Sequence, residues 1–256
     1  MSWIVYAFVI GLCFGSFANV LAYRLPRKVS ILMPPSGCIA CKASIAYYDL
    51  LPVLSWIILK GRCRFCKVCI SIRYPLMELI CGLLFAGMVI LTPTFSAVFL
   101  SLFAFMMLVV ALIDHDTLEI SDSLLVFTAL LGVTWVVLSH FSLLFPMAPD
   151  FIGAGLGILA GGIPLFAIDR LVMILYKKDG FGYGDVKLMA VCGLFLGWQL
   201  IFVAYVIAFI VGGMYASFLL ISGRAKRGQY IAFGPFLVAG VIISLWVGKA
   251  FIDFLL

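Results

Sequence analysis

Residues 95–113 read FSAVFLSLFAFMMLVVALI, a run that contains no charged side chain. A helix needs about 20 predominantly apolar residues to cross the hydrocarbon core of a bilayer. The run therefore predicts a membrane-spanning helix, and with it the fold class of the chain. Asp114 follows the run directly. An ionisable side chain at the end of a span is energetically expensive and indicates a functional site.

Composition extends this prediction to the whole chain. Of the 256 residues, 66% are hydrophobic and 11% are charged, and the mean hydropathy is +1.27. Soluble domains contain only about 45–50% apolar residues. We therefore expect an all-α polytopic membrane protein in contact with lipid. The net charge of +6 does not indicate nucleic-acid binding, because the basic residues cluster beside the hydrophobic runs, as in other membrane proteins.

The apolar runs predict about eight transmembrane helices. They lie at about 3–22, 74–91, 95–113, 123–144, 151–176, 187–197, 200–221 and 231–252. The sixth is short and glycine-rich, and its loss would invert the topology of everything after it. The chain then has three regions: a first transmembrane helix (1–23), a cytoplasmic segment (24–73) and a seven-helix membrane domain (74–256).

The connections between these spans alternate between basic and non-basic. Lysine and arginine occur in residues 24–73, 177–178 and 224–227, whereas the connections around 92–94, 145–150 and 198–199 contain none. Cytoplasmic connections carry the excess of Lys and Arg. We therefore expect the N-terminus outside the cell. Asp114 and Asp185 then both lie at the cytoplasmic ends of spans, where they can meet.

Gly182-Tyr183-Gly184-Asp185 places a second carboxylate at the opening of an apolar run. Two carboxylates a few ångströms apart cannot both ionise, so one can act as a general base on water while the other holds a proton. This is the minimal apparatus of an aspartic peptidase, and we interpret Asp114 and Asp185 as the candidate catalytic pair. Which of them is the base stays open, because a coupled pair titrates as a unit.

Simpler explanations exist for the polar residues of this region. Asp185 could be a helix N-cap after a flexible turn, and Asp122 could be only a cap. Lys187 either favours the ionised form of one carboxylate or marks the membrane boundary. We interpret the remaining residues as solvated or structural: His115, Asp116, Glu119 and the in-span pair Asp169-Arg170.

Five of the eight cysteines fall within residues 24–73. Two CxxC pairs supply four thiolates for a tetrahedral Zn²⁺ site, and disulfides are rare in the cytoplasm. We expect Cys38, Cys41, Cys63 and Cys66 to bind a structural zinc ion, because the segment is too short to form much core of its own. Cys69 also has CxxC spacing from Cys66 and could replace one ligand.

Two other classes of function use similar features. Intramembrane carboxylates also serve proton-coupled transporters. Here, however, the acids lie at one face, and the two halves of the chain show no corresponding pair of broken helices. A zinc-binding membrane adaptor with an inert helical bundle would depend on the cysteines and not on the aspartates.

Several motifs, in the same order along the chain, resemble the type IV prepilin peptidase family. The resembling motifs are GSFANV at 15–20, RLP at 24–26, the two CxxC pairs, RYPLME at 73–78, IDHD at 113–116, GYGDVK at 182–187 and FGPF at 233–236. The chain differs from the family at two short stretches: it has ISD at 120–122, where the family usually has LPD, and LLP at 50–52, where the family commonly has NIP.

This resemblance implies an enzyme of the bacterial inner membrane. It would cut the basic leader of a prepilin or pseudopilin after a glycine at the cytoplasmic face, with Asp114 and Asp185 as the catalytic pair, for type IV pili or type II secretion. It also implies N-methylation of the new terminus by S-adenosylmethionine, with residues 24–73 as the possible methyltransferase segment. That segment contains no glycine-rich cofactor fingerprint, so no residue is assigned to S-adenosylmethionine.

Overall fold

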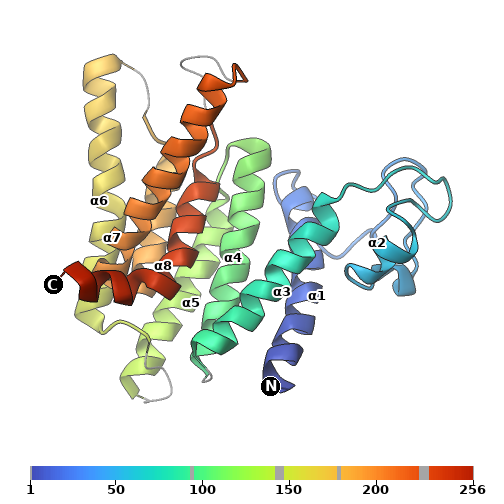
Figure 1. Ribbon diagram of the computed structural model, residues 1–256, viewed down its shortest axis with the longest axis horizontal. Coiled ribbons are helices and arrows are strands. Elements are labelled where there is room, and N and C mark those ends of the chain that lie inside the picture. Colours follow the sequence, from blue (N-terminus) through green and yellow to red (C-terminus); the bar gives the residue numbers. More distant parts are fainter. Residues whose placement is uncertain (1, 93–94, 142–146, 178–179, 225–230, 256) are drawn as a thin grey trace. The chain divides into compact units, whose positions relative to one another are not determined.

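The computed structural model describes the whole chain except residues 1, 93–94, 142–146, 178–179, 225–230 and 256 (Figure 1). The described residues form helices without a strand, which confirms the all-α prediction. The helices are α1 (Ser2–Arg24), η1 (Tyr47–Leu50), α2 (Leu54–Ile58), α3 (Arg73–Leu91), α4 (Ser96–Thr117), α5 (Asp122–Phe141), α6 (Phe151–Tyr176), α7 (Tyr183–Ile221) and α8 (Gly234–Leu255).

Six of these helices, α1 and α3–α7, are long and apolar enough to cross a membrane, and residues 234–248 of α8 form a shorter apolar stretch. The expected multi-pass character is therefore confirmed by length and composition. The chain divides into two compact units, and the boundary falls between Val109 and Val110 inside α4. The first unit contains α1, η1, α2, α3 and most of α4, and the second contains the end of α4 and α5–α8.

In the first unit, α1 and α3 pack closely because glycines face the contact. A Cβ added at Gly15 would lie 2.6 Å from the Cα of Glu78, and one added at Gly11 would lie 2.7 Å from the carbonyl oxygen of Cys81. Small residues allow helix backbones to approach each other in this way, and they are typical of helix contacts in membranes.

In the second unit, α7 is the central helix and packs against α5, α6 and α8 (Figure 1). Its contact with α6 depends on Gly157 and Gly161, which have GxxxG spacing. A Cβ at Gly157 would overlap the carbonyl of Gly193, and a Cβ at Gly161 would overlap the carbonyl of Met189. The two backbones therefore touch, and only glycine fits at these positions.

The chain reverses direction at Gly197, inside α7. Gly197 has φ 75° and ψ 172°, a region that is essentially restricted to glycine. Met189 and Tyr205 lie eight residues on either side of it and would be roughly 24 Å apart in one straight helix. Both contact Gly161: the Met189 carbonyl faces it, and the Tyr205 hydroxyl donates to its carbonyl. The reversal agrees with the expected boundary between the sixth and seventh spans.

The first limb of α7, which is the part before Gly197, begins earlier than expected. The sixth span was predicted from residue 187, whereas α7 starts at Tyr183 with Gly182 as its N-cap. Asp185 therefore lies in the first helical turn, and the interpretation of Asp185 as the N-cap is wrong. The physical reason is that the extended backbone of Gly182 (φ −70°, ψ 144°) already supplies the cap conformation. The last residues of the fourth expected span, 142–144, lie outside the described residues.

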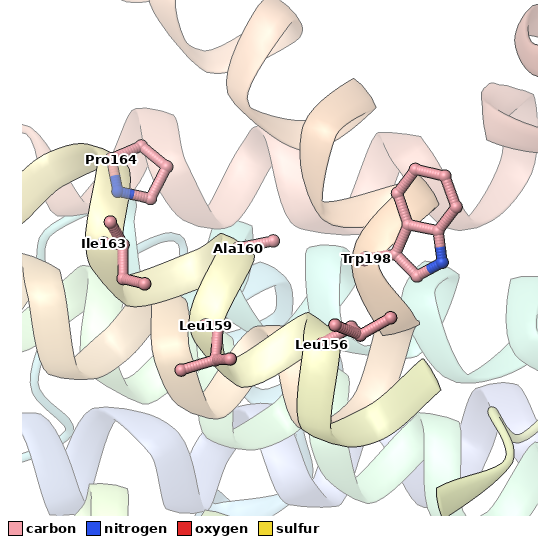
Figure 2. Close-up of a pocket in the computed structure, with 6 residues that line it drawn as sticks. All are labelled: Leu156, Leu159, Ala160, Ile163, Pro164 and Trp198. Atoms are coloured by element: carbon pink, nitrogen blue, oxygen red, sulfur yellow. The ribbon is translucent and has the colours of Figure 1, made fainter. Parts of the chain in front are cut away.

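One surface hollow is almost entirely apolar. It has a volume of about 390 Å³ and lies along α6 next to the helix-internal Pro164, with one wall from the start of the second limb of α7 (Figure 2). Its lining suits contact with lipid and provides no group for acid–base chemistry. The lining residues are Leu156, Leu159, Ala160, Ile163, Pro164 and Trp198.

Candidate active site

Asp114 lies in the last turn of α4 and is buried, with 5% of its surface exposed. Its carboxylate oxygen Oδ2 accepts a hydrogen bond of 2.9 Å from the backbone N–H of Gly234, the first residue of α8. The first-turn N–H groups of a helix have no partner within the helix and carry the positive end of its dipole. The start of α8 therefore supplies a favourable environment for this carboxylate and fixes its orientation.

Asp185 contributes the second carboxylate, from the first turn of α7. Its Oδ1 atom is buried and has no hydrogen-bond partner in the described part of the chain. A buried polar atom without a partner is destabilising, and in a native structure it commonly marks a functional site. Oδ1 of Asp185 is thus available to a water molecule or a substrate group.

The structure brings the two predicted carboxylates together within the second unit. Both lie in the same compact unit, although 71 residues separate them in the sequence. The residues next to the two helix ends also touch: a Cβ added at Gly184 in α7 would lie 3.0 Å from the side chain of Ile120, which follows α4. Two interacting carboxylates that share one proton can act as a general base and a general acid at the same time.

The neighbouring charged residues behave differently. Lys187 pairs with Asp122 at 2.8 Å, with 54% and 70% of the two side chains exposed. Such an exposed pair contributes little stability, and it leaves Lys187 occupied away from Asp185. His115 and Glu119 are exposed on the surface.

Gly234 was missed as a site residue, because its motif was noted only as part of a family resemblance. The space around Gly234 is too small for a side chain: a Cβ there would lie 2.6 Å from Oδ2 and 2.9 Å from Cγ of Asp114. A glycine before a proline at the start of an apolar helix is a weak local signal. Nothing in the sequence connects Gly234 with a residue 120 positions earlier.

The four predicted zinc ligands form one cluster. The sulfur atoms of Cys38, Cys41, Cys63 and Cys66 all lie within 4.8 Å of one another. Zn–S bonds of about 2.3 Å in a tetrahedron separate neighbouring sulfurs by about 3.8 Å. Sγ of Cys38 and Sγ of Cys66 are 3.7 Å apart, so the donor set fits a Zn²⁺ ion.

The two CxxC turns are copies of the same knuckle. Lys42 and Lys67, the residues after each pair, have φ of 60° and 58° and donate their N–H to the carbonyls of Cys38 and Cys63. Cys69 pairs through its backbone with the residue before Cys63, as Ser44 does in the first knuckle. Cys69 therefore occupies a structural position of the turn and lies outside the four-sulfur cluster.

The backbone favours a thiolate at one cysteine of this cluster. The N–H groups of Cys41 and Ala40 lower the pKa of the Cys38 thiol to about 6, whereas desolvation and the neighbouring thiols raise the pKa of Cys66 to about 11. Beside the cluster, Arg64 of the second knuckle forms two hydrogen bonds, of 2.5 and 2.7 Å, with the carboxylate of Asp49 in η1. This pairing lowers the pKa of Asp49 and ties η1 to the knuckle.

Glu78 joins the same segment to α3. This carboxylate is 8% exposed, and its Oε2 accepts the backbone N–H of Val53 at 2.7 Å. Val53 has a positive φ of 61° at the start of α2, a conformation that is unusual for a β-branched residue. The hydrogen bond that the Val53 N–H donates to Glu78 stabilises that strained position.

Comparison with known proteins gives consistent matches along the chain. Residues 9–92 match the Bacterial Peptidase A24 N-terminal domain, and residues 101–217 match the Type IV leader peptidase family. The relatives include the prepilin leader peptidase/N-methyltransferases of Stutzerimonas stutzeri and Pseudomonas putida. The first is 32% identical, with 96% of this chain and 91% of the relative covered, and the second is 33% identical, with 95% and 90% covered. No solved structure matches the chain.

Proposed function

This chain belongs to the type IV leader peptidase family, and on that premise we propose that it cuts the leader peptides of prepilins and pilin-like precursors. The cut falls after a glycine at the cytoplasmic face of the inner membrane, and N-methylation of the new terminus follows. The observation that carries the peptidase proposal is the pair formed by buried Asp114 and half-buried Asp185, in which the buried oxygen Oδ1 of Asp185 has no protein partner in the described region.

In the proposed cleavage, one aspartate is ionised and removes a proton from water. The resulting hydroxide attacks the scissile carbonyl carbon while the other, protonated aspartate donates its proton to the carbonyl oxygen. Collapse of the tetrahedral intermediate breaks the C–N bond. The proton held by the first aspartate goes to the leaving amine, and one hydroxyl of the intermediate returns its proton to the second aspartate as the new carboxyl group forms. The pair then returns to its starting state with one shared proton.

Gly234 supports this chemistry by holding Asp114. A hydrogen bond from its N–H leaves the second oxygen of the carboxylate for proton transfer. Correct orientation of reacting groups contributes several kcal/mol to catalysis, and a misplacement of about 1 Å can lower the rate by about 10²-fold. The site therefore depends on the junction between α4 and α8 as well as on the two aspartates.

The four-cysteine cluster serves a structural role in this proposal. Cys38, Cys41, Cys63 and Cys66 would hold one Zn²⁺ ion, which organises the cytoplasmic segment when bound. The described part of that segment contains no glycine-rich turn for a nucleotide. Methyl transfer from S-adenosylmethionine is therefore proposed from family membership alone, without a residue assigned to it.

The substrate would approach from the cytoplasmic side. The proposed topology has the N-terminus outside, residues 24–73 as the cytoplasmic zinc-binding and possible methyltransferase segment, and residues 74–256 as the peptidase domain. Exposed acidic residues next to Asp114, namely Asp116 and Glu119, would attract the basic leader of the precursor.

The test uses protein reconstituted in lipid nanodiscs and a synthetic prepilin peptide with a basic leader. Wild type should release the leader after glycine, and Asp114→Asn and Asp185→Asn should not, while Asp122→Asn, the exposed carboxylate control, should cleave normally. Mass spectrometry with and without S-adenosylmethionine reports the added methyl group. Cleavage by correctly inserted Asp185→Asn would overturn the assignment, and an inactive, zinc-loaded wild type would favour a transporter or an adaptor.

A further inference from the structure

Asp169 is a buried carboxylate that the cleavage mechanism does not use. It lies inside the apolar helix α6, with 3% of its surface exposed. Its Oδ1 accepts two hydrogen bonds, from the backbone N–H of Gly180 at 3.0 Å and of Phe181 at 3.2 Å. These two residues directly precede Gly182, the N-cap of the helix that carries Asp185.

The two hydrogen bonds satisfy the acceptor Oδ1 of Asp169 at this buried position. A buried charge is costly unless other groups compensate for it, and two N–H groups that converge on one oxygen provide such compensation. They can converge only if Gly180 and Phe181 adopt one particular backbone conformation. Asp169 therefore selects a single arrangement of the chain that leads into Asp185.

Arg170, the next residue, holds the other side of the same turn. Its Nη2 donates to the hydroxyl of Tyr183, and its guanidinium lies 5.0 Å from the ring centre of Phe166 and 5.6 Å from that of Tyr183. Tyr183 is the first residue of α7. The turn is thus fixed before Gly182 by Asp169 and after it by Arg170.

The ring of Phe181 links this turn to the support of Asp114. Its centroid is 5.2 Å from that of Phe233 and 6.1 Å from that of Phe209. Phe233 directly precedes Gly234, whose N–H holds Asp114. A displacement of Phe181 would therefore disturb the supports of both carboxylates.

We propose that Asp169 and Arg170 are positioning residues for peptide-bond cleavage, which clamp the turn of residues 180–183 and so hold Asp185 against Asp114. This inference rests on the proposed function. The two residues take no part in proton transfer. They act on the turnover rate through the placement of Asp185, and binding of the leader is unaffected.

The test compares Asp169→Ala, Asp169→Asn and the control Asp150→Ala in the nanodisc cleavage assay. Asparagine keeps the Oδ1 acceptor and alanine removes it. Asp150 is the matched control because it caps the opposite end of α6 with the same kind of bond, 2.9 Å from its Oδ1 to the N–H of Gly153. Asp169→Ala should lower kcat by about 10²-fold at unchanged KM, whereas Asp169→Asn and Asp150→Ala should stay within a few-fold of wild type.

A second pair of variants tests the other side of the clamp even if Asp169→Ala fails to fold. Arg170→Met and Tyr183→Phe remove the same hydrogen bond from its two ends. Each should lower kcat, and the double variant should lose no more than the worse single variant, because the two changes act on one interaction.

The outcomes separate this inference from the proposed function. Full kcat in Asp169→Ala and Tyr183→Phe, with Asp185→Ala inactive, would refute the clamp and leave the catalytic pair intact. An equal loss in Asp169→Asn and Asp169→Ala would also refute it, because the charge and not the acceptor would then matter. Cleavage by Asp185→Ala would instead refute the catalytic site.

Discussion

Replacing Gly234 with alanine is the sharpest steric test of the active site. The substitution keeps the backbone N–H that binds Asp114 and adds one methyl group. That group would lie 2.6 Å from Oδ2 and 3.1 Å from Cβ of Asp114. Ordinary van der Waals contact begins near 3.4 Å, so the carboxylate would have to retreat by about 0.8 Å.

The expected effect on turnover is large. Displacement of a reacting group by about 1 Å can cost about 10²-fold in rate, so Gly234→Ala should lower kcat by one to two orders of magnitude, about 1.4 kcal/mol of barrier per order. Stability should change less. Overpacking typically costs about 1–3 kcal/mol, and alanine offsets roughly 1 kcal/mol of that by its higher helix propensity.

The assay is steady-state cleavage of the prepilin peptide at saturating concentration in nanodiscs, with thermal unfolding measured on the same samples. Gly213→Ala in α7 is the matched control, because a Cβ there meets nothing within 4 Å. Its kcat should equal that of wild type. Equal kcat values for Gly234→Ala and Gly213→Ala would show that the carboxylate of Asp114 is not confined by the start of α8, and the reasoning would fail.

Two further predictions concern the zinc cluster and the helix contact. Cys63→Ser should abolish stoichiometric zinc, measured by mass spectrometry of the metal, whereas Cys69→Ser should retain it; loss of zinc in both would restore Cys69 as a ligand. Gly157→Ala should destabilise the protein by about 1–3 kcal/mol or more, since its Cβ would overlap the Gly193 carbonyl, whereas Gly155→Ala has open space and should not. Equal Tm values for these two variants would contradict the close α6–α7 contact.

The fold class could be predicted because a helix that contacts lipid must be made of apolar residues, and this requirement is visible in the composition. Long uncharged runs, such as residues 95–113, predict helices whatever their neighbours are. The ends of helices were harder to predict: the sixth span was expected from residue 187, whereas α7 begins at Tyr183. The reason is local, since polar Tyr183 and Asp185 resemble a loop in composition while their backbone is already helical.

Some residues of the candidate site could be predicted from the sequence, and others could not. The carboxylates and thiolates are rare residue types in a conspicuous setting, so their pattern alone indicates chemistry. Gly234 and Asp169 act through backbone N–H groups, and every residue except proline has such a group. Sequence reasoning placed Asp169 among structural residues, because its partners at Gly180 and Phe181 become visible only when the turn is folded.

A backbone N–H donor, such as that of Gly234 to Asp114, also suits the proposed chemistry. A lysine or arginine beside the pair would favour the ionised form of both carboxylates, whereas the mechanism needs one shared proton. Two cations near the pair are directed elsewhere: Lys187 pairs with exposed Asp122, and Arg170 donates to Tyr183. A backbone N–H orients a carboxylate without bringing a full positive charge to it. We infer that the bundle positions its acids with neutral groups so that the proton can move between them.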